Sequence, residues 1–417
     1  MSLIATNRNY RLLFSAAAVS NLGDGIAMLA FPWLATLVTR DAALIALVAA
    51  ASRLPWLLFS LPAGVITDQY DRRRLMLLAD VLRTMITAGV IGLVLSAPAL
   101  PLADDSAQAP IFIFGLCAAA FLLGSAEVLR DNAAQTAMPS IVEKSELEKA
   151  NGQLWSIEQI MGQFVGPPVA GILIALAVPV PFVVNALMFG GAAWCMWLVV
   201  LAPRDKPDVI NGFWSQMREG IDWIRSHALI LRLAIMLGGV NFVFFMSATI
   251  LVLLSQEIYG LSAAGHGILL TAGAVGGVAG GMIGPLVSKR LGGHRTVMMT
   301  LFAFPLPLLI LAVTSNPYVA SIALFMEVFF GMIWNVVTVS LRQRIIPDEL
   351  LGRVNSIYRF FGWGTIPLGA LFAGFLVNGL EGEFGRELAL RAPYIFGVAA
   401  SIFMAIYGAL KLRIPPS

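Results

Sequence analysis

Charged residues are scarce in this sequence. Only 12% of its 417 residues are Asp, Glu, Lys or Arg, whereas 59% are hydrophobic. A soluble domain usually carries about 25% charged residues. A water-soluble chain could not bury this much apolar side chain, because even a large core leaves much of its surface wet. The composition therefore excludes an ordinary soluble protein and indicates a chain whose solvent is lipid.

Residues that carry catalysis or bind metals are also few. The two cysteines, Cys117 and Cys195, lie in separate apolar runs, and the three histidines are dispersed. Neither spacing is that of a zinc site or a disulfide framework. The sequence has no GxxxxGK(S/T) phosphate loop and no nucleophile elbow. We therefore expect no enzyme, no catalytic residue, no metal and no cofactor.

Long apolar runs fill the chain instead. A membrane-spanning helix needs about 20 mostly apolar residues. We predict twelve spans, near residues 12–38, 42–66, 75–98, 111–129, 152–176, 180–202, 229–254, 263–287, 295–314, 317–340, 356–379 and 392–411. The expected fold class is an all-α integral membrane protein, with the lipid bilayer as its surroundings.

The positive charges give these spans a direction. If the N-terminus is cytoplasmic, only Arg40, Arg386 and Arg391 of the 27 lysines and arginines fall in outside segments. Cytoplasmic loops normally carry the excess of Lys and Arg. We therefore expect both termini to be cytoplasmic, in a cell inner (plasma) membrane. The net charge of +3 lies in these short loops, so we expect no nucleic-acid partner.

The longest polar stretch, residues 203–228, separates six spans from six. We predict an N-terminal bundle over 1–202, a cytoplasmic linker over 203–228 and a C-terminal bundle over 229–417. Within the linker, an apolar face predicts an amphipathic helix lying at the membrane surface; it consists of Phe213, Met217, Ile221 and Ile224. The two halves are pseudo-symmetric, since Gln135 and Pro139 recur as Gln343 and Pro347 before the fifth and eleventh spans. Many transporters consist of two such related bundles.

The loop after the second span carries a recognisable pattern. Residues 64–74 read GVITDQYDRRR. This resembles the loop signature of the major facilitator superfamily at Gly64, Asp68, Arg72 and Arg73, with Arg74 completing the basic run. Gln69 and Asp71 depart from the pattern. The resemblance covers nearly the whole chain and implies a cytoplasmic interlock, in which Asp68 lies near the start of the eleventh helix. The alternative is that the arginines only orient the loop.

The fifth span carries a second pattern, GQFVGPPVAG over residues 162–171. It resembles the fifth-helix signature of exporters in this superfamily, with Ala170 in place of one glycine. Small residues let helix backbones approach closely, and prolines kink helices; the pattern residues are Gly162, Gly166, Pro167 and Gly171. Plain helix packing is the alternative. Residues 21–25, 131–139 and 352–355 further resemble the branch that includes enterobactin exporters and macrolide efflux pumps.

Ionisable residues deep in a span are costly and are candidates for function. Asp24 in the first span and Arg53 in the second lie at nearly the same depth, so we expect them to pair. The pair is either structural or a proton or cation switch. Glu327 in the tenth span is a second protonatable or substrate-binding candidate, and Glu158 a shallower one at the cytoplasmic gate. Asp80 and Arg83, three apart, predict a local pair.

Further polar and aromatic residues in the spans are candidates for lining a central cavity, although each alone is more often a packing residue: Asn21, Asn185, Asn241, Trp334, Asn335 and Tyr358. We expect a monomeric secondary transporter that exports a small amphipathic solute, drug-like or siderophore-like, by alternating access in exchange for protons. Two alternatives stay open: a lysolipid or metabolite carrier of the same fold, and a non-transporting membrane scaffold.

Overall fold

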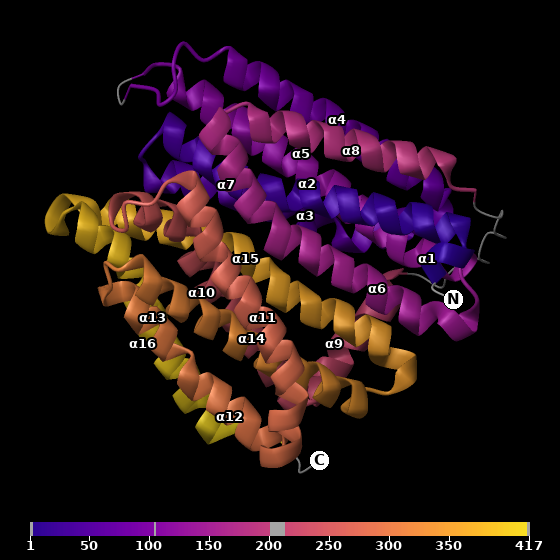
Figure 1. The fold of residues 1–417 in the computed structure, drawn as a ribbon. Coiled ribbons are helices and arrows are strands. Elements are labelled where there is room, and N and C mark those ends of the chain that lie inside the picture. Colours follow the sequence, from indigo (N-terminus) through magenta and orange to yellow (C-terminus); the bar gives the residue numbers. More distant parts are fainter. Residues whose placement is uncertain (1–2, 104–105, 201–212, 415–417) are drawn as a thin grey trace. The chain divides into compact units, whose positions relative to one another are not determined.

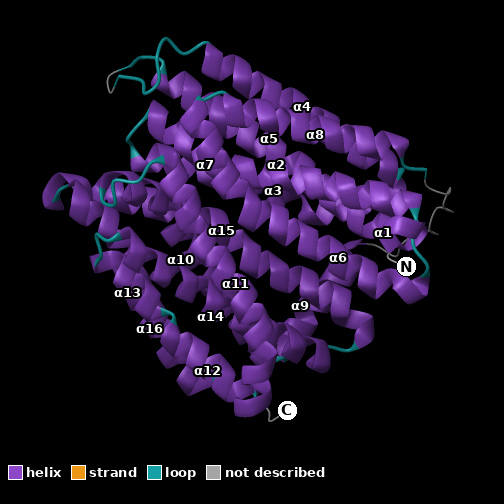
Figure 2. Ribbon diagram, in the orientation of Figure 1, coloured by secondary structure: helices purple, strands orange, loops and turns teal. Residues whose placement is uncertain are grey.

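The computed structural model describes residues 3–103, 106–200 and 213–414. These residues fold into helices joined by short loops, with no strand among them (Figure 2). Twelve helical segments in this part of the chain are long and apolar enough to cross a membrane. The prediction of an all-helical protein with twelve spans is therefore confirmed.

The chain forms two compact units. Unit 1 comprises Met1–Arg40, Ala51–Asp208 and Ser262–Ile268, and unit 2 comprises Asp41–Ala50, Val209–Leu261 and Leu269–Ser417. Each unit therefore takes one short piece from a helix that belongs mostly to the other. Hydropathy along the chain could not predict this exchange, because it depends on which helix ends pack together.

The helices of the first half follow in chain order: α1 (Leu3–Thr6), α2 (Arg8–Val38), α3 (Ala42–Gln69), α4 (Arg72–Leu95), α5 (Ala109–Ala137), the 3-10 turns η1 (Met138–Ser140) and η2 (Lys144–Glu146), α6 (Leu147–Gln159), the π-helical turn η3 (Ile160–Val165), α7 (Gly166–Leu176) and α8 (Val180–Leu198). In unit 1, α4 packs against both α5 and α8, and α8 packs against α2 (Figure 1). The candidate residues of the first span thus lie on a helix with neighbours on several sides.

The second half comprises α9 (Phe213–Ser226), α10 (Ala228–Glu257), α11 (Ala263–Leu291), α12 (Gly293–Ala303), α13 (Pro305–Val313), α14 (Pro317–Ile345), α15 (Asp348–Phe384) and α16 (Arg386–Lys411). The predicted ninth span is divided into α12 and α13 just before Pro305, which has no backbone N–H to continue the helix. Gly292 turns the chain between α11 and α12 with a φ of 79°, which side chains rarely allow.

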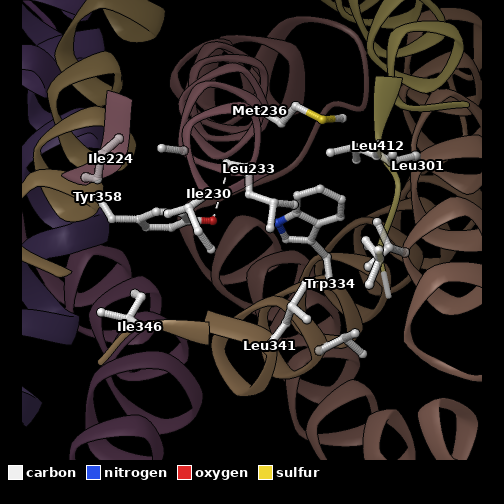
Figure 3. Close-up of a cluster of buried hydrophobic side chains, with 14 of the residues drawn as sticks. Ile224, Ile230, Leu233, Met236, Leu301, Trp334, Leu341, Ile346, Tyr358 and Leu412 are labelled. Atoms are coloured by element: carbon white, nitrogen blue, oxygen red, sulfur yellow. Dashed lines mark hydrogen bonds between the residues drawn. The ribbon is translucent and has the colours of Figure 1, made fainter. Parts of the chain in front are cut away.

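A buried apolar cluster joins α9 to the other helices of unit 2 (Figure 3). Ile224 is only 2% exposed and belongs to the same cluster as Ile346 and Tyr358. The prediction that this apolar face lies on the membrane is therefore wrong for Ile224. The reason is that α15 begins at Asp348, eight residues before the predicted span, and offers the face a protein partner. The side chains of Phe213 and Met217 lie outside the described residues.

Two aromatic residues predicted to line a cavity belong to this core as well. Trp334 and Tyr358 are each 1% exposed, and the Tyr358 hydroxyl donates to the carbonyl of Leu233 at 3.2 Å. Of the two roles left open for these residues, packing rather than cavity lining is the one that the structure shows. Both are large rings that stabilise the cluster by removing apolar area from water and lipid headgroups.

Candidate functional site

Asp24 lies on α2 and is bound by an arginine from α4. The Arg83 guanidinium donates to Oδ1 of Asp24, and also to the Ser20 hydroxyl at 2.8 Å. Arg83 is 1% exposed, whereas 27% of the Asp24 side chain remains exposed. The ion pair is thus buried on its arginine side and accessible on its carboxylate side.

A second carboxylate forms an ion pair with the same arginine, through its other terminal nitrogen. Asp80, one turn earlier on α4, is 0% exposed and lies 3.7 Å from Arg83 Nη1. Asp80 also accepts from Arg130 Nε of α5 at 2.8 Å, and Arg130 Nη1 lies 3.8 Å from Asp131. Five charges therefore alternate in sign across three helices. Buried charges are tolerated only when they are paired in this way.

Further acidic groups surround this row. Glu127 on α5 interacts electrostatically with Asp24, Asp131 and Arg53, and Glu158 on α6 interacts with Asp24 and Arg130. The cluster therefore holds five carboxylates and three guanidiniums, a formal difference of two negative charges; its members are Asp24, Asp80, Glu127, Asp131 and Glu158 with Arg53, Arg83 and Arg130. A low-dielectric site favours neutralisation of such an excess by protons or by a bound cation.

The structure identifies a partner for Asp24 that sequence reasoning missed. The expected pair joined Asp24 to Arg53, but Arg83 is the residue that binds Asp24, while Arg53 interacts with Glu127. The predicted local contact of Asp80 with Arg83 is present. Depth along a helix could indicate that Asp24 needs a cation. Only the packing of α4 against its neighbours decides which arginine reaches it.

The basic loop pattern places Arg73 at the end of another helix. Its guanidinium donates to the carbonyls of Met196, at 3.2 Å, and Trp197, in the last turn of α8. The neighbouring Asp71 caps α4, accepting from the Arg74 backbone N–H at 2.8 Å. This position departs from the family pattern, and the departure supplies a helix cap. Gly64 and Asp68 both lie in α3, Arg72 in the first turn of α4; the Asp68 side chain lies outside the described residues.

The glycine and proline pattern of the fifth span makes close backbone contacts. A Cβ on Gly25 of α2 would lie 2.4 Å from the Gly162 carbonyl oxygen, and a Cβ on Gly166 would lie 2.4 Å from Gly25 Cα. A Cβ on Gly171 would lie 2.5 Å from the Ala263 carbonyl. Pro167 follows directly after the π-helical turn of residues 160–165. The pattern therefore packs α2 tightly at the residue next to Asp24.

Unit 2 contains a buried carboxylic acid in a different setting. Glu327 of α14 is 7% exposed and lies beside Ser247 of α10, whose carbonyl accepts from the Tyr394 hydroxyl at 3.0 Å. Among the described residues Glu327 has no cationic partner. Nearby, in the loop between α10 and α11, burial raises the pKa of Tyr259 to about 12, although Arg391 opposes the shift.

The remaining polar candidates are divided between packing and exposed positions. Asn21 donates to the Ala17 carbonyl of its own helix at 2.9 Å, and Asn241 donates to Gly362 of α15 at 2.8 Å. Asn335 is exposed on α14. In the part of the chain that the structure describes, no three His, Cys, Asp or Glu side chains form a group that could hold a metal ion.

Proteins of known function resemble the chain over almost its full length. The family described as transmembrane secretion effector matches residues 5–412. The multidrug efflux pump Tap of Mycobacterium tuberculosis is 25% identical over 408 residues, covering 92% of this chain and 90% of the relative. The staphyloferrin A transporter of Staphylococcus aureus is 24% identical over 418 residues, 98% of each chain. The enterobactin exporter EntS of Shigella boydii is 23% identical, covering 99% and 93%.

Solved structures agree on the fold. The nucleoside transporter NupG matches with a TM-score of 0.76 at 10% identity, covering 97% of this chain and 100% of the other. A bacterial homologue of the iron transporter ferroportin matches with a TM-score of 0.72 at 17% identity, with the same coverage. The family and the named relatives favour a transporter over a membrane scaffold. The chain belongs to the transmembrane secretion effector family of the major facilitator superfamily, and it is a multi-pass transporter of that family, not an enzyme.

Proposed function

We propose that this transporter exports a small amphipathic solute by alternating access, in exchange for protons, with Asp24 as the proton-binding residue. The observation that carries the proposal is the alternating row of Asp24, Arg83, Asp80, Arg130 and Asp131 inside unit 1. Such a row is costly in a membrane protein, so it indicates a function that needs charge in that place.

The row can accept a proton without leaving an arginine unpaired. If Asp24 takes up a proton, Arg83 keeps the negative charge of Asp80 at 3.7 Å and its bond to Ser20. A buried charge that loses its only partner would be strongly destabilised. Because Asp80 shares Arg83, the protonated and ionised forms of Asp24 both have low-energy arrangements, as a reversible switch requires. Alternating access would follow if the two conformations favour different forms.

The excess of two carboxylates also suits a solute with positive charge. A cation that binds beside the exposed side of Asp24 would compete with the proton for the same negative charge. This competition is the simplest coupling between export and proton entry, since only one of the two is bound at a time. The names of the relatives widen the choice to drugs and siderophores, because one is a multidrug pump and two handle siderophores.

The other candidate residues take supporting roles in this proposal. Both termini are cytoplasmic in the inner membrane, and the chain works as a monomer of two bundles, 1–202 and 229–417. The loop of Gly64, Asp68 and Arg72 acts as a cytoplasmic interlock, and Glu158 lies at the cytoplasmic gate. Glu327, Asn241 and Asn335 contribute to solute binding from the second half.

Accumulation of ethidium in cells, with and without the transporter, tests the proposal. Lower accumulation that disappears when the proton gradient is collapsed would support proton-driven export. The Asp24→Asn variant should abolish this export, whereas Asp222→Asn, at a surface position of α9 that is 63% exposed, should leave it unchanged. We expect Glu327→Gln to reduce export less than Asp24→Asn. Proton-driven export by Asp24→Asn at the normal rate would refute the assignment of Asp24.

No effect on ethidium would point to a narrower solute, such as a siderophore or a lysolipid. The discriminating measurement is then purified protein in proteoliposomes with a pH-sensitive dye inside, screened against solutes of each class. A solute that moves without any proton movement would refute antiport, while leaving the fold and family unaffected.

A further inference from the structure

Several buried polar atoms beside Asp24 have no partner among the described residues. Asn185 of α8 is 0% exposed, and neither its Oδ1 nor its Nδ2 makes a hydrogen bond within the described chain. The same holds for the hydroxyl of Thr87 on α4, also 0% exposed, and for Nε of Arg83. Buried polar atoms are satisfied in the great majority of cases, by protein or by ordered water.

The packing of α8 against α2 and α4 indicates that these atoms lie near one another. A Cβ on Gly23 would lie 2.6 Å from Asn185 Oδ1 and 2.9 Å from the Phe189 ring, so both side chains point at the residue before Asp24. The Arg83 guanidinium lies 3.8 Å from the centroid of that ring. Because α4 and α8 run in opposite directions, the turn after Arg83 faces the turn before Phe189. This register brings Thr87 opposite Asn185.

The chemistry of the group fits water. Arg83 Nε and the amide nitrogen of Asn185 are donors, the amide oxygen is an acceptor, and the Thr87 hydroxyl is both. A buried water typically makes about three hydrogen bonds to otherwise unsatisfied polar groups. A metal cation is disfavoured by the Arg83 guanidinium. An anion is disfavoured because Asp24 already binds that guanidinium.

We propose that Asn185, Thr87 and Arg83 Nε enclose a buried water site behind Asp24, and that this water relays the proton to and from Asp24. The role as a relay rests on the proposed function, whereas the water site itself does not. In the relay step, the water gives one proton to a carboxylate oxygen of Asp24 while it takes up another proton on its opposite side, so the water stays neutral. Arg83 keeps its protons and its contact with Asp80. In the reverse step, the water takes the proton of Asp24 and gives up another.

The position of the site explains why such a route is useful. The exposed side of Asp24 is the side that a solute could cover, whereas the bound side faces Arg83. A route behind the carboxylate would let the proton leave while a solute covers the front. The charged groups that surround this route come from α2 to α6, since α8 carries none; they are Asp24, Arg53, Asp80, Arg83, Glu127, Arg130, Asp131 and Glu158.

Hydroxyl-radical footprinting with X-ray pulses tests the water site, because radicals formed from a bound water oxidise the side chains beside it. Phe189 and Phe112 are both buried, at 1% and 3% exposure. Phe112 lies near the start of α5, 18 residues before Arg130 and therefore about 27 Å from it along the helix, away from the polar group. We expect Phe189 to be oxidised and Phe112 to remain unmodified in the wild-type protein. Equal protection of both rings would overturn the site.

Paired variants then separate the site from the relay. Thr87→Val and Asn185→Leu remove the polar atoms with little change in shape, so oxidation of Phe189 should be lost. Thr36→Val is the control, since its hydroxyl, 2% exposed on α2, bonds to Trp33 at 2.7 Å away from the site. If Asn185→Leu fails to fold, Thr87→Val alone serves the test. Persistent oxidation of Phe189 in a folded Thr87→Val, Asn185→Leu double variant would assign the radicals to another source and overturn the site.

Transport by the same variants tests the relay. In proteoliposomes, proton-coupled export should slow by at least about 10-fold, as expected when a proton-transfer group is removed, while the Kd for ethidium stays unchanged. An unchanged rate despite loss of the Phe189 signal would overturn the relay and keep the water site. If the wild-type protein moves no protons at all, the proposed antiport fails and the relay with it, but the footprint still decides the water site.

Discussion

The two units of this transporter share a helical architecture and differ in what they bury. Unit 1 buries a row of opposite charges on α2, α4 and α5, in which each arginine lies between two carboxylates. Both units bury an apolar cluster, but the buried acid of unit 2, Glu327, has no cation beside it among the described residues. The difference indicates that a repeated fold need not repeat its chemistry. A charge that is paired can be ionised inside a membrane protein, whereas a solitary acid is stable there only when neutral.

Replacing one carboxylate in each unit should give the largest difference in stability between the two units. Asp80→Leu leaves Arg83 and Arg130 without their shared partner, so the free energy of unfolding should fall by about 3–5 kcal/mol. Glu327→Gln keeps the shape and the hydrogen-bonding capacity of a solitary neutral acid, so the change should stay within about 1 kcal/mol. Unfolding by sodium dodecyl sulfate in mixed micelles measures both. Similar losses in the two variants would contradict the contrast between paired and solitary acids.

Both units also bring helix backbones into contact through glycine, and here they should behave alike. A Cβ on Gly25 in unit 1 would lie 2.4 Å from a carbonyl oxygen, and one on Gly276 in unit 2 would lie 2.1 Å from the Phe325 carbonyl. Gly25→Ala and Gly276→Ala should each lower the unfolding free energy by about 1–3 kcal/mol, because backbone cannot move aside as a side chain can.

Two glycines with open space serve as controls for these substitutions. No atom lies within 4 Å of a Cβ added at Gly89 of α4 or Gly331 of α14. Gly89→Ala and Gly331→Ala should therefore stabilise their helices by about 0.5–1 kcal/mol, the usual gain of alanine over glycine inside a helix. The same unfolding measurement compares all four variants. A loss of stability in both controls would show that alanine is harmful for reasons other than close approach.

The sequence predicts the twelve spans well, because lipid requires about 20 apolar residues per crossing whatever the neighbours are. It also predicts that Asp24 and Glu327 are acids within the spans, since each interrupts an apolar run. It does not predict that Arg83 rather than Arg53 is the arginine bound to Asp24. That choice depends on how helices rotate and pack, and many rotations satisfy the same hydropathy pattern.

The basic residues show a similar limit. The distribution of Lys and Arg among the loops predicts how the helices are oriented in the membrane. The few arginines predicted on the other side are then exceptions to that distribution. Arg391 proves to be a packing residue, since it is 8% exposed and donates to the carbonyls of Ala312 and Thr314, at 2.8 and 3.0 Å, where α13 ends. Arg386 binds Glu257 and Glu381, each at 2.9 Å. A count of charges in loops could not show that Arg391 binds the carbonyls at a helix end or that Arg386 forms ion pairs.

Arginines that cap helix ends allow a smaller comparison between the units. Arg391 in unit 2 is buried, and Arg73 in unit 1 is half-buried and donates to the end of α8. Arg391→Gln should lower the unfolding free energy by about 1.5–3 kcal/mol, the range for hydrogen bonds of a charged group. Arg73→Gln should cost about 0.5–1.5 kcal/mol, because water or headgroups can replace the lost donor. The order of the two losses would be reversed if the contact of Arg73 with the end of α8 contributed more to stability than the contacts of Arg391 near the start of α16.

Helix caps provide the smallest and most closely matched pair. Asp71 accepts from the Arg74 N–H at 2.8 Å at the start of α4, and Asn316 accepts from the Tyr318 N–H at 2.9 Å at the start of α14. Asp71→Ala and Asn316→Ala should each lower the unfolding free energy by about 1 kcal/mol, while Asp71→Asn should retain the cap. If Asp71→Ala slows export well beyond Asn316→Ala at the same loss of stability, then Asp71 does more than cap α4. The loop it belongs to would then take part in the transport cycle, as the family resemblance implies for its neighbour Asp68. Equal rates in the two alanine variants would leave Asp71 as a cap alone.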